Sequence, residues 1–190
     1  MARQKPRTGG RPNRHTAERK DPQATREGDL REILEGSSCP LILILDSVQD
    51  PHNLGAILRS ADGAGVDLVI APKDRAVGIT EVVRRISVGA ADHVRFMRVT
   101  NLVRTMEELK EAGVWLVGTS DQTELSLYQA DLKGPLAIVM GAEGPGSRRL
   151  TEEKCDFLVQ SPMKGRAACL NVSAATGGSL LADLRQRESA

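Results

Sequence analysis

Residues 41–65 read LILILDSVQDPHNLGAILRSADGAG, and this stretch determines the class of fold. It begins with a run of aliphatic residues that shows no alternation between apolar and polar positions. Such a run is typical of a strand that is covered on both faces of a sheet. A turn at Asp50-Pro51 follows, and then a helix is predicted over about 53–64, with Asn53 as its N-cap. The stretch is therefore a strand, a turn and a helix, the repeating unit of an α/β domain.

The same alternation continues to the end of the chain. The predicted strands are 41–46, 67–72, 93–99, 114–120, 136–141 and 157–162, and the other predicted helices are 29–36, 79–89, 101–112, 147–153 and 171–187. This order predicts an α/β domain with a mostly parallel sheet flanked by helices. In such sheets the sites lie at the carboxyl ends of the strands, so the loops after strands are the candidate functional segments.

The beginning of the chain differs from the rest in charge. Residues 1–20 contain seven Lys or Arg and one Glu, a net charge of +6 in a chain of net charge +1. Residues 1–38 are predicted to be a basic, disordered arm with a short helix, and the folded domain is predicted to span 39–190. Such an arm suits contact with nucleic acid, although a solubilising tail has the same composition. We find no signal-peptide pattern and no apolar run near the ~18 residues of a membrane helix, so we expect a cytoplasmic protein.

Cysteines and aromatic residues narrow the range of functions. Cys39, Cys155 and Cys169 are far apart in sequence and have no histidine near them, so we expect neither a disulfide framework nor a metal site. The chain has only four aromatic residues, which argues against a sheet that stacks RNA bases on aromatic side chains. An RNA partner would have to be bound through charge and shape.

The first candidate loop leads into the helix predicted at 53–64. On that helix Asn53, Ile57 and Ser60 are spaced to share one face. Arg59 lies about 120° away around the helix axis, and it borders the same cavity as Asn53 only if the preceding turn curls. A capped helix with a surface arginine explains the same residues without any function.

The second candidate loop lies in VMGAEGPGSRRL (139–150). Gly141, Gly144 and Gly146 follow an apolar strand and allow a ligand to approach the backbone closely. The pattern is neither G-x-G-x-x-G nor a P-loop, so it indicates a nucleotide phosphate site only weakly. Glu143 would repel a phosphate, so the loop favours a ligand with neutral or cationic groups, such as a sulfonium. A tight turn with a solvated glutamate is the alternative.

The third candidate loop is SPMKGRAACLNVSAATGGSLL (161–181). Pro162 and Gly165 shape the loop, and the small residues that follow let another chain segment come close. Gly177 and Gly178 each cost about 1 kcal/mol inside a helix, so they indicate tight packing there. An ordinary close-packed helix explains this stretch when it is taken alone.

Taken together, the three loops resemble the three signature motifs of the SpoU/TrmH family of RNA 2′-O-methyltransferases. The matching segments are DPHNLGAILRSADGAG, IVMGAEGPGSRRL and PMKGRAACLNVSAATG, which occur in the order and spacing of the family, and the resemblance covers 41 to about 188. Segments between them, such as VGAADHVRFMRVTNL, resemble the bacterial 23S rRNA guanosine 2′-O-methyltransferase branch.

The resemblance implies a fold, a reaction and partners. It implies a C-terminal deep trefoil knot, a rare exception to the rule that chains are un-knotted. It further implies S-adenosylmethionine as cofactor, a homodimer with the site at its interface, and methyl transfer to a ribose 2′-hydroxyl of RNA, here a guanosine of 23S rRNA, without a metal. A tRNA 2′-O-methyltransferase and a non-catalytic RNA-binding relative remain alternatives. A dinucleotide-binding oxidoreductase would rest only on the glycines after a strand.

Residue roles also follow from the resemblance. The residues that fall on the catalytic positions are Asn53, Arg59, Glu143 and Asn171, and those that fall on cofactor contacts are Thr119, Gly141, Ser161, Met163 and Leu170. The family's proposed base is the arginine of the first motif. Because a guanidinium stays protonated in proteins, we instead expect Arg59 to orient the target hydroxyl and its neighbouring phosphate.

The chain departs from the family pattern in three places. Cys169 stands where this branch usually has a serine, and a thiol is the weaker hydrogen-bonding group. Ser161 stands where an isoleucine usually opens the third motif. The branch also carries an N-terminal RNA-binding domain resembling a ribosomal protein, whereas this chain has about 35 basic, disordered-looking residues there. This last difference leaves the RNA target open.

Overall fold

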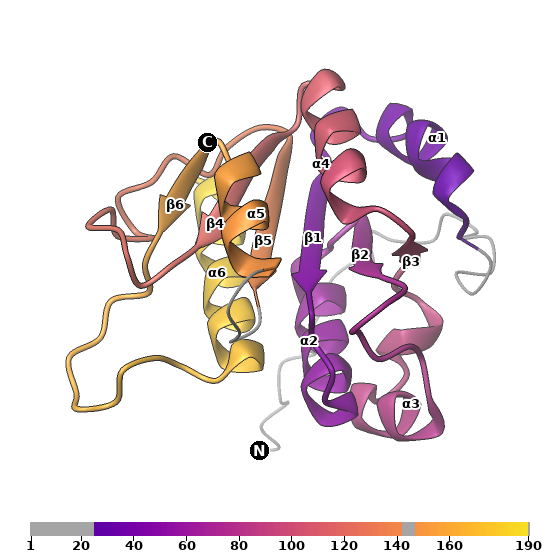
Figure 1. The fold of residues 1–190 in the computed structure, drawn as a ribbon, viewed down its shortest axis with the longest axis horizontal. Helices are drawn as coiled ribbons and strands as arrows, with labels where there is room; N and C mark the ends of the chain where they lie inside the picture. Colours follow the sequence, from indigo (N-terminus) through magenta and orange to yellow (C-terminus); the bar gives the residue numbers. More distant parts are fainter. Residues whose placement is uncertain (1–24, 142–146, 190) are drawn as a thin grey trace, which may run out of the picture.

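Six parallel strands form the centre of the structure (Figure 1). The computed structural model describes residues 25–141 and 147–189. The strands are β1 (Leu41–Asp46), β2 (Leu68–Pro72), β3 (Phe96–Val99), β4 (Trp115–Thr119), β5 (Leu136–Gly141) and β6 (Phe157–Val159). They lie in the order β3-β2-β1-β5-β4-β6, and each neighbouring pair is parallel. The predicted α/β class with a parallel sheet is confirmed; the trefoil knot stays a prediction.

Helices cover both faces of the sheet (Figure 1). They are the short 3₁₀ turns η2 (Glu27–Asp29) and η3 (Ala90–Asp92) and the helices α1 (Leu30–Glu35), α2 (Pro51–Ala64), α3 (Glu81–Ser87), α4 (Leu102–Glu111), α5 (Ser147–Lys154) and α6 (Val172–Glu188). Residues of α2, α3 and α6 pack on one face. Residues of α1 and α4 pack on the other, together with Cys155, which directly follows α5. The structure is therefore a three-layer sandwich.

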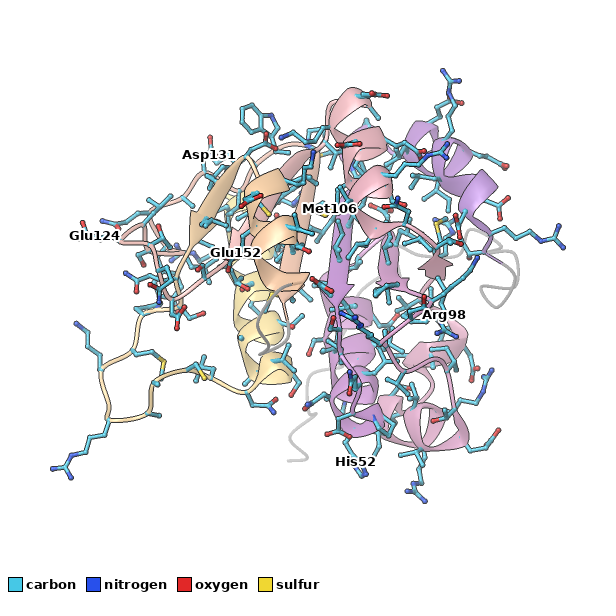
Figure 2. All side chains as sticks on the ribbon, viewed as in Figure 1. His52, Arg98, Met106, Glu124, Asp131 and Glu152 are labelled. Atoms are coloured by element: carbon cyan, nitrogen blue, oxygen red, sulfur yellow. The ribbon has the colours of Figure 1, made fainter. Side chains whose placement is uncertain are left out.

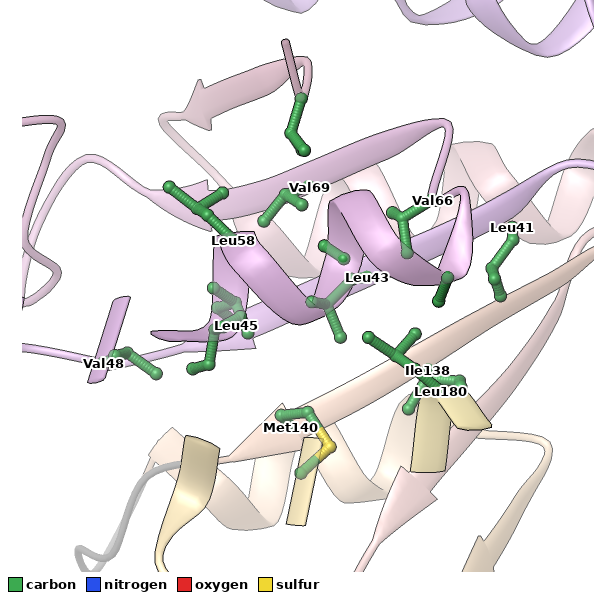
Figure 3. Close-up of a cluster of buried hydrophobic side chains, with 14 of the residues drawn as sticks. Leu41, Leu43, Leu45, Val48, Leu58, Val66, Val69, Ile138, Met140 and Leu180 are labelled. Carbon is green, nitrogen blue, oxygen red and sulfur yellow. The ribbon is translucent and has the colours of Figure 1, made fainter. Parts of the chain in front are cut away.

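Strand β1 shows why its sequence does not alternate. Leu43 and Leu45 point into the cluster that packs against α2 and α6 (Figure 3), while Ile42 and Ile44 point into the cluster beneath α4. All four side chains are fully buried. Burying one such side chain stabilises the fold by about 1.5–3 kcal/mol, so both faces of this strand drive folding.

Each predicted strand and helix is present, and the differences lie at the ends. Strand β3 begins at Phe96 rather than residue 93, because η3 and its following turn take up the preceding residues. Helix α2 begins at Pro51, and its N-cap is Asp50, whose side chain accepts a hydrogen bond from the backbone N–H of His52 at 2.9 Å. The prediction that Asn53 caps this helix is wrong: proline fits the first helical position and fixes the start earlier.

Glycines in α6 were predicted to mark tight packing, and the structure separates them. A Cβ atom on Gly177 would lie 3.4 Å from the Oγ atom of Ser60 in α2, an ordinary contact. A Cβ atom on Gly178 would meet no atom of the described chain within 4 Å. Within the described chain the prediction therefore does not hold for Gly178, which is exposed. The tighter approach lies between α2 and α3, where a Cβ atom on Gly55 would lie 2.6 Å from that of Ile86.

Candidate active site

The candidate site lies where the connections of the sheet diverge. Strands β1 and β5 are adjacent, with Asp46 paired to Gly141 at their carboxyl ends. The chain continues from β1 to β2 on one side, whereas β4 and β6 lie on the other side of β5. Ligands of open parallel sheets bind at such a point, outside the carboxyl ends of the strands. The first two candidate loops both start at this edge.

The first and third motifs meet through two asparagine side chains. The Nδ2 atom of Asn171 donates a hydrogen bond to the Oδ1 atom of Asn53 at 3.2 Å, although 118 positions separate them in sequence. Asn171 is also the N-cap of α6, because its Oδ1 atom accepts hydrogen bonds from the backbone N–H and the Oγ–H of Ser173 at 2.9 and 2.6 Å. The structure therefore brings these two predicted site residues together and orients both amides.

Asp50 explains how Asn53 is available for this contact. Because Asp50 caps α2, the amide of Asn53 is not needed at the start of the helix. Asn53 instead lies in the first turn, half-buried, on the face that packs against α6. Ser60 lies two turns further along the same face, next to Gly177. The predicted common face of Asn53 and Ser60 is confirmed.

Arg59 lies on a different side of α2. Its side chain is exposed, and it makes no hydrogen bond or ion pair with residues 25–141 or 147–189. The structure therefore does not place Arg59 against the two asparagines. It leaves a guanidinium on the surface of the helix that carries Asn53, where it can contact a large ligand.

The second motif is described only at its ends. Gly141 is half-buried at the end of β5, and Glu143 lies outside the described residues. Next to this strand end, the Oγ1 atom of Thr119 donates a hydrogen bond to the backbone oxygen of Val139 at 3.3 Å. Thr119 and Gly141, two of the predicted cofactor contacts, thus end adjacent strands.

The third motif forms a loop that projects away from the sheet (Figure 1). Ser161 and Met163 are half-buried near the end of β6, but Leu170 is 44% exposed. Residues 163–168 make no hydrogen bond or ion pair within the described chain, so their backbone groups are available to a ligand. Leu170 is not among the residues that line the small pocket beside Thr119 and Gly141.

The predictions from sequence did not include a buried carboxylate at this edge. Asp46 is 5% exposed, and its Oδ2 atom accepts a hydrogen bond from the Oγ1 atom of Thr151 in α5 at 2.7 Å. Its Oδ1 atom accepts one from Ser47 at 2.8 Å. Ser47 has a φ of 64°, a left-handed conformation that costs a non-glycine residue energy. An aspartate at the end of an otherwise aliphatic strand was the available signal for this contact.

The described residues give little support for a nucleophilic cysteine or for a metal site. Burial is the main cause that raises the pKa of the Cys155 thiol to about 12, so this cysteine stays protonated and is a poor nucleophile. Among residues 25–141 and 147–189, no cluster of three His, Cys, Asp or Glu side chains could hold a metal ion. Within the same residues, no helix is both long and apolar enough to cross a membrane.

Comparison with known sequences gives a consistent set of relatives. The sequence model of the SpoU rRNA Methylase family matches residues 40–180. The chain is 58% identical over 163 residues to the 23S rRNA (guanosine-2′-O-)-methyltransferase RlmB of Shewanella oneidensis, and 54% identical over 166 residues to that of Pseudomonas aeruginosa. These matches cover 86% and 87% of this chain but 66% and 67% of the relatives. The chain therefore spans about two thirds of the length of these relatives.

Comparison with solved structures points the same way. The SpoU methyltransferase AviRb from Streptomyces viridochromogenes, in complex with AdoMet, matches with a TM-score of 0.74 at 28% identity, covering 81% of this chain and 63% of that one. The A. aeolicus TrmH/SpoU tRNA modifying enzyme matches with a TM-score of 0.73 at 33% identity, covering 85% and 82%. The sequence match, the parallel sheet and the meeting of the first and third motifs agree. The chain belongs to the SpoU rRNA Methylase family.

Proposed function

We propose that this chain is an RNA methyltransferase that transfers a methyl group from S-adenosylmethionine to a ribose 2′-hydroxyl of RNA. The observation that carries the proposal is the hydrogen bond between Asn53 and Asn171, which joins the first and third motifs at the carboxyl edge of the sheet. The relatives at 52–58% identity are named as enzymes of 23S rRNA that act on guanosine. A guanosine of 23S rRNA is therefore the proposed substrate.

The residues around the third loop fit S-adenosylmethionine. The cofactor carries a cationic sulfonium, an amino group and a carboxylate, which need several polar partners. Residues 163–168 expose backbone groups without partners in the described chain, and the hydroxyl of Thr119 lies at the neighbouring strand end. Ser161, Met163, Leu170 and Gly141 complete the proposed binding set. When bound, the cofactor supplies an electrophilic methyl group.

The protein's own residues would position the ribose rather than attack it. Amides of Asn53 and Asn171 offer fixed donors and acceptors, because each is held by the other and by the start of α6. Arg59 would hold the phosphate next to the target ribose through its forked N–H groups, which suit a phosphate. Glu143 is the proposed acidic residue that the second motif contributes to the site. Orienting two reactants in this way can lower a barrier by several kcal/mol.

We further propose that two copies of the chain form the working enzyme. One face of α6 is not covered by residues 25–141 or 147–189: Ala174, Gly178 and Leu181 follow each other at helical spacing, and Leu181 is 63% exposed. Small residues followed by an exposed leucine suit packing against another helix. Because Asn171 begins the same helix, a second copy on this face would lie next to the site. A cytoplasmic location is proposed with it.

A non-catalytic RNA-binding relative is the second candidate, and Cys169 is the observation that favours it. This cysteine lies two residues before Asn171 in the exposed third loop. The test is methyl transfer from labelled S-adenosylmethionine to 23S rRNA by the chain itself and by Cys169→Ser. An inactive parent with an active Cys169→Ser variant supports the hypothesis of a non-catalytic RNA-binding relative. Clear transfer by the parent supports the enzyme.

A further inference from the structure

A groove with several charged side chains in its lining lies along the same edge of the sheet, beside β2 and β3. It has a volume of about 700 Å³, and its lining includes Arg26, Lys73, Arg84 and Arg98. Glu27 is the acidic residue among those that line it. Arg84 is ion-paired with Asp92, just outside the lining, so the four cations face two acids and remain in excess. No residue of the proposed active site belongs to its lining.

Glu27 is held in this groove by three donors on one oxygen. Its Oε1 atom accepts hydrogen bonds from the Nζ atom of Lys73 at 2.7 Å, from the backbone N–H of Thr100 at 2.8 Å and from the Oγ1 atom of Thr100 at 2.9 Å. The bond from Lys73 is the main cause that lowers the pKa of Glu27, with Thr100 adding to it. An ammonium, an amide and a hydroxyl around one anionic oxygen are a phosphate-binding set.

These donors lie at the ends of strands, as the residues of the proposed active site do. Lys73 directly follows β2 and Thr100 directly follows β3, so both lie at the carboxyl edge that also carries Asn53. Thr100 immediately precedes Asn101, the N-cap of α4, whose N-terminus favours anions. Arg98 belongs to β3, and its side chain lines the same groove (Figure 2). Its guanidinium bonds to the backbone oxygens of Lys73 and Ala76.

We propose that this groove binds the phosphate backbone of the substrate RNA, and that Glu27 occupies the position of one phosphate until RNA displaces it. The proposal rests on the proposed function for the identity of the anion. RNA seated at β1 for methyl transfer can continue along the strand ends to Lys73 and Thr100. In sequence, the basic segment precedes Thr25, which also lines the groove. Glu27 would then weaken binding of other anions while it competes with RNA.

Two neutral substitutions test the groove with opposite expected signs. Binding of the full chain to a fluorescent 23S rRNA fragment is measured at several salt concentrations. Lys73→Gln removes one phosphate contact, so affinity should fall about three- to tenfold near 0.1 M salt and the salt slope should decrease by about one unit. Glu27→Gln removes the competing carboxylate, so affinity should rise about two- to fivefold.

The chain offers a closely matched control pair. Lys154 and Glu107 form an ion pair of 2.6 Å with side chains 40% and 49% exposed, against 2.7 Å and 52% and 43% for Lys73 and Glu27. Lys154 ends α5, before β6, so it lies toward the opposite edge of the sheet. Lys154→Gln and Glu107→Gln should leave RNA affinity and salt slope within twofold of the parent.

The outcomes separate this groove from the proposed reaction. RNA affinity that falls in Lys73→Gln, rises in Glu27→Gln and is kept in Lys73→Arg supports RNA binding in the groove. Shifts no larger than those of the control pair overturn it, as does equal loss in Lys73→Gln and Lys73→Arg, which would indicate a packing role. Methyl transfer by the parent is measured on the same RNA. Its absence would count against the proposed function while the binding shifts still decide the groove.

Discussion

Asn53 and Asn171 hold the first and third motifs together through a side-chain hydrogen bond of 3.2 Å. The contact joins the first turn of α2 to the N-cap of α6, so it depends on both helices starting where they do. It explains how loops that are far apart in sequence form one site at the carboxyl edge of the sheet.

Substitutions of Asn171 can separate its structural role from its proposed role in the site. Asn171→Ala removes the cap of α6 and should lower the free energy of unfolding by about 0.5–2 kcal/mol. Asn171→Asp keeps the acceptor for Ser173 but loses the donor to Asn53, so stability should stay close to that of the parent. Both variants lose the hydrogen bond to Asn53, so the rate of methyl transfer should fall at least about tenfold. A tenfold fall in rate corresponds to an increase of about 1.4 kcal/mol in the activation barrier. Urea unfolding and a methyl-transfer assay check this; full activity in Asn171→Asp would reject the role of the amide pair.

Replacing Arg59 should affect the reaction and not the fold. Its side chain is exposed and has no partner within the described chain, so Arg59→Ala should change stability by less than about 0.5 kcal/mol. Methyl transfer should be lost while binding of S-adenosylmethionine, measured by calorimetry, stays intact. Arg104→Ala, at an exposed arginine of α4 in a surface ion pair with Glu108, is the matched control and should stay active. An active Arg59→Ala variant would contradict the proposed role of Arg59 in the reaction.

A charge on the open face of α6 should prevent dimer formation. Leu181 is 63% exposed, and Leu181→Lys should leave the chain folded but shift it to a monomer in light scattering. Because the site is proposed to lie at the dimer interface, methyl transfer should fall with it. Leu150→Lys places the same charge at a 55% exposed leucine of α5, on the other face of the sheet, and should keep the parent's oligomeric state. A parent that is already monomeric would contradict the proposed assembly.

The end of α6 is fixed by an arginine that contacts three parts of the chain. Arg187 binds both carboxylate oxygens of Asp183, at 2.9 and 2.8 Å, and the backbone oxygens of Cys39 and Gly134 at 3.0 and 2.8 Å. The Asp183 side chain is fully buried. Arg187→Met leaves this carboxylate without its partner, so unfolding free energy should fall by about 3–5 kcal/mol.

The pH dependence of that variant follows from the same carboxylate. Burial raises the pKa of Asp183, and Arg187 opposes the rise. A carboxyl group whose pKa is raised by folding contributes most stability at low pH, and this contribution is lost as pH rises through the raised value. Without Arg187 the pKa rises further, so the stability deficit of Arg187→Met should be smaller at pH 5 than at pH 8. An equal deficit at both values, measured by urea unfolding, would show that Asp183 is not the cause.

Local sequence patterns predicted the elements of the fold well, because most strands are apolar runs and most helices are amphipathic or begin at a capping residue. The start of α2 was misplaced because Asp50-Pro51 was interpreted as a turn, whereas proline at the first helical position and aspartate before it are a helix start. The outward position of Gly178 could not be predicted, since a glycine in a helix looks the same whether a neighbour is near or absent.

The site was predicted only in part, for a physical reason. Motif resemblance named Asn53 and Asn171, but periodicity cannot show that two side chains 118 positions apart share a hydrogen bond. The same limit applies to Glu27, which meets Thr100 across 73 positions. Such pairs are set by the order of strands in the sheet. The roles of Glu143, which lies outside the described residues, and of the cofactor contacts stay predictions.

The most direct test of the account is methyl transfer itself. The purified chain is incubated with labelled S-adenosylmethionine and unmodified 23S rRNA, and ribose methylation is mapped along the RNA. We predict label at the 2′-oxygen of a guanosine, with none in parallel reactions of Arg59→Ala. A folded parent that binds S-adenosylmethionine but leaves every 2′-hydroxyl of the RNA unmodified would contradict it.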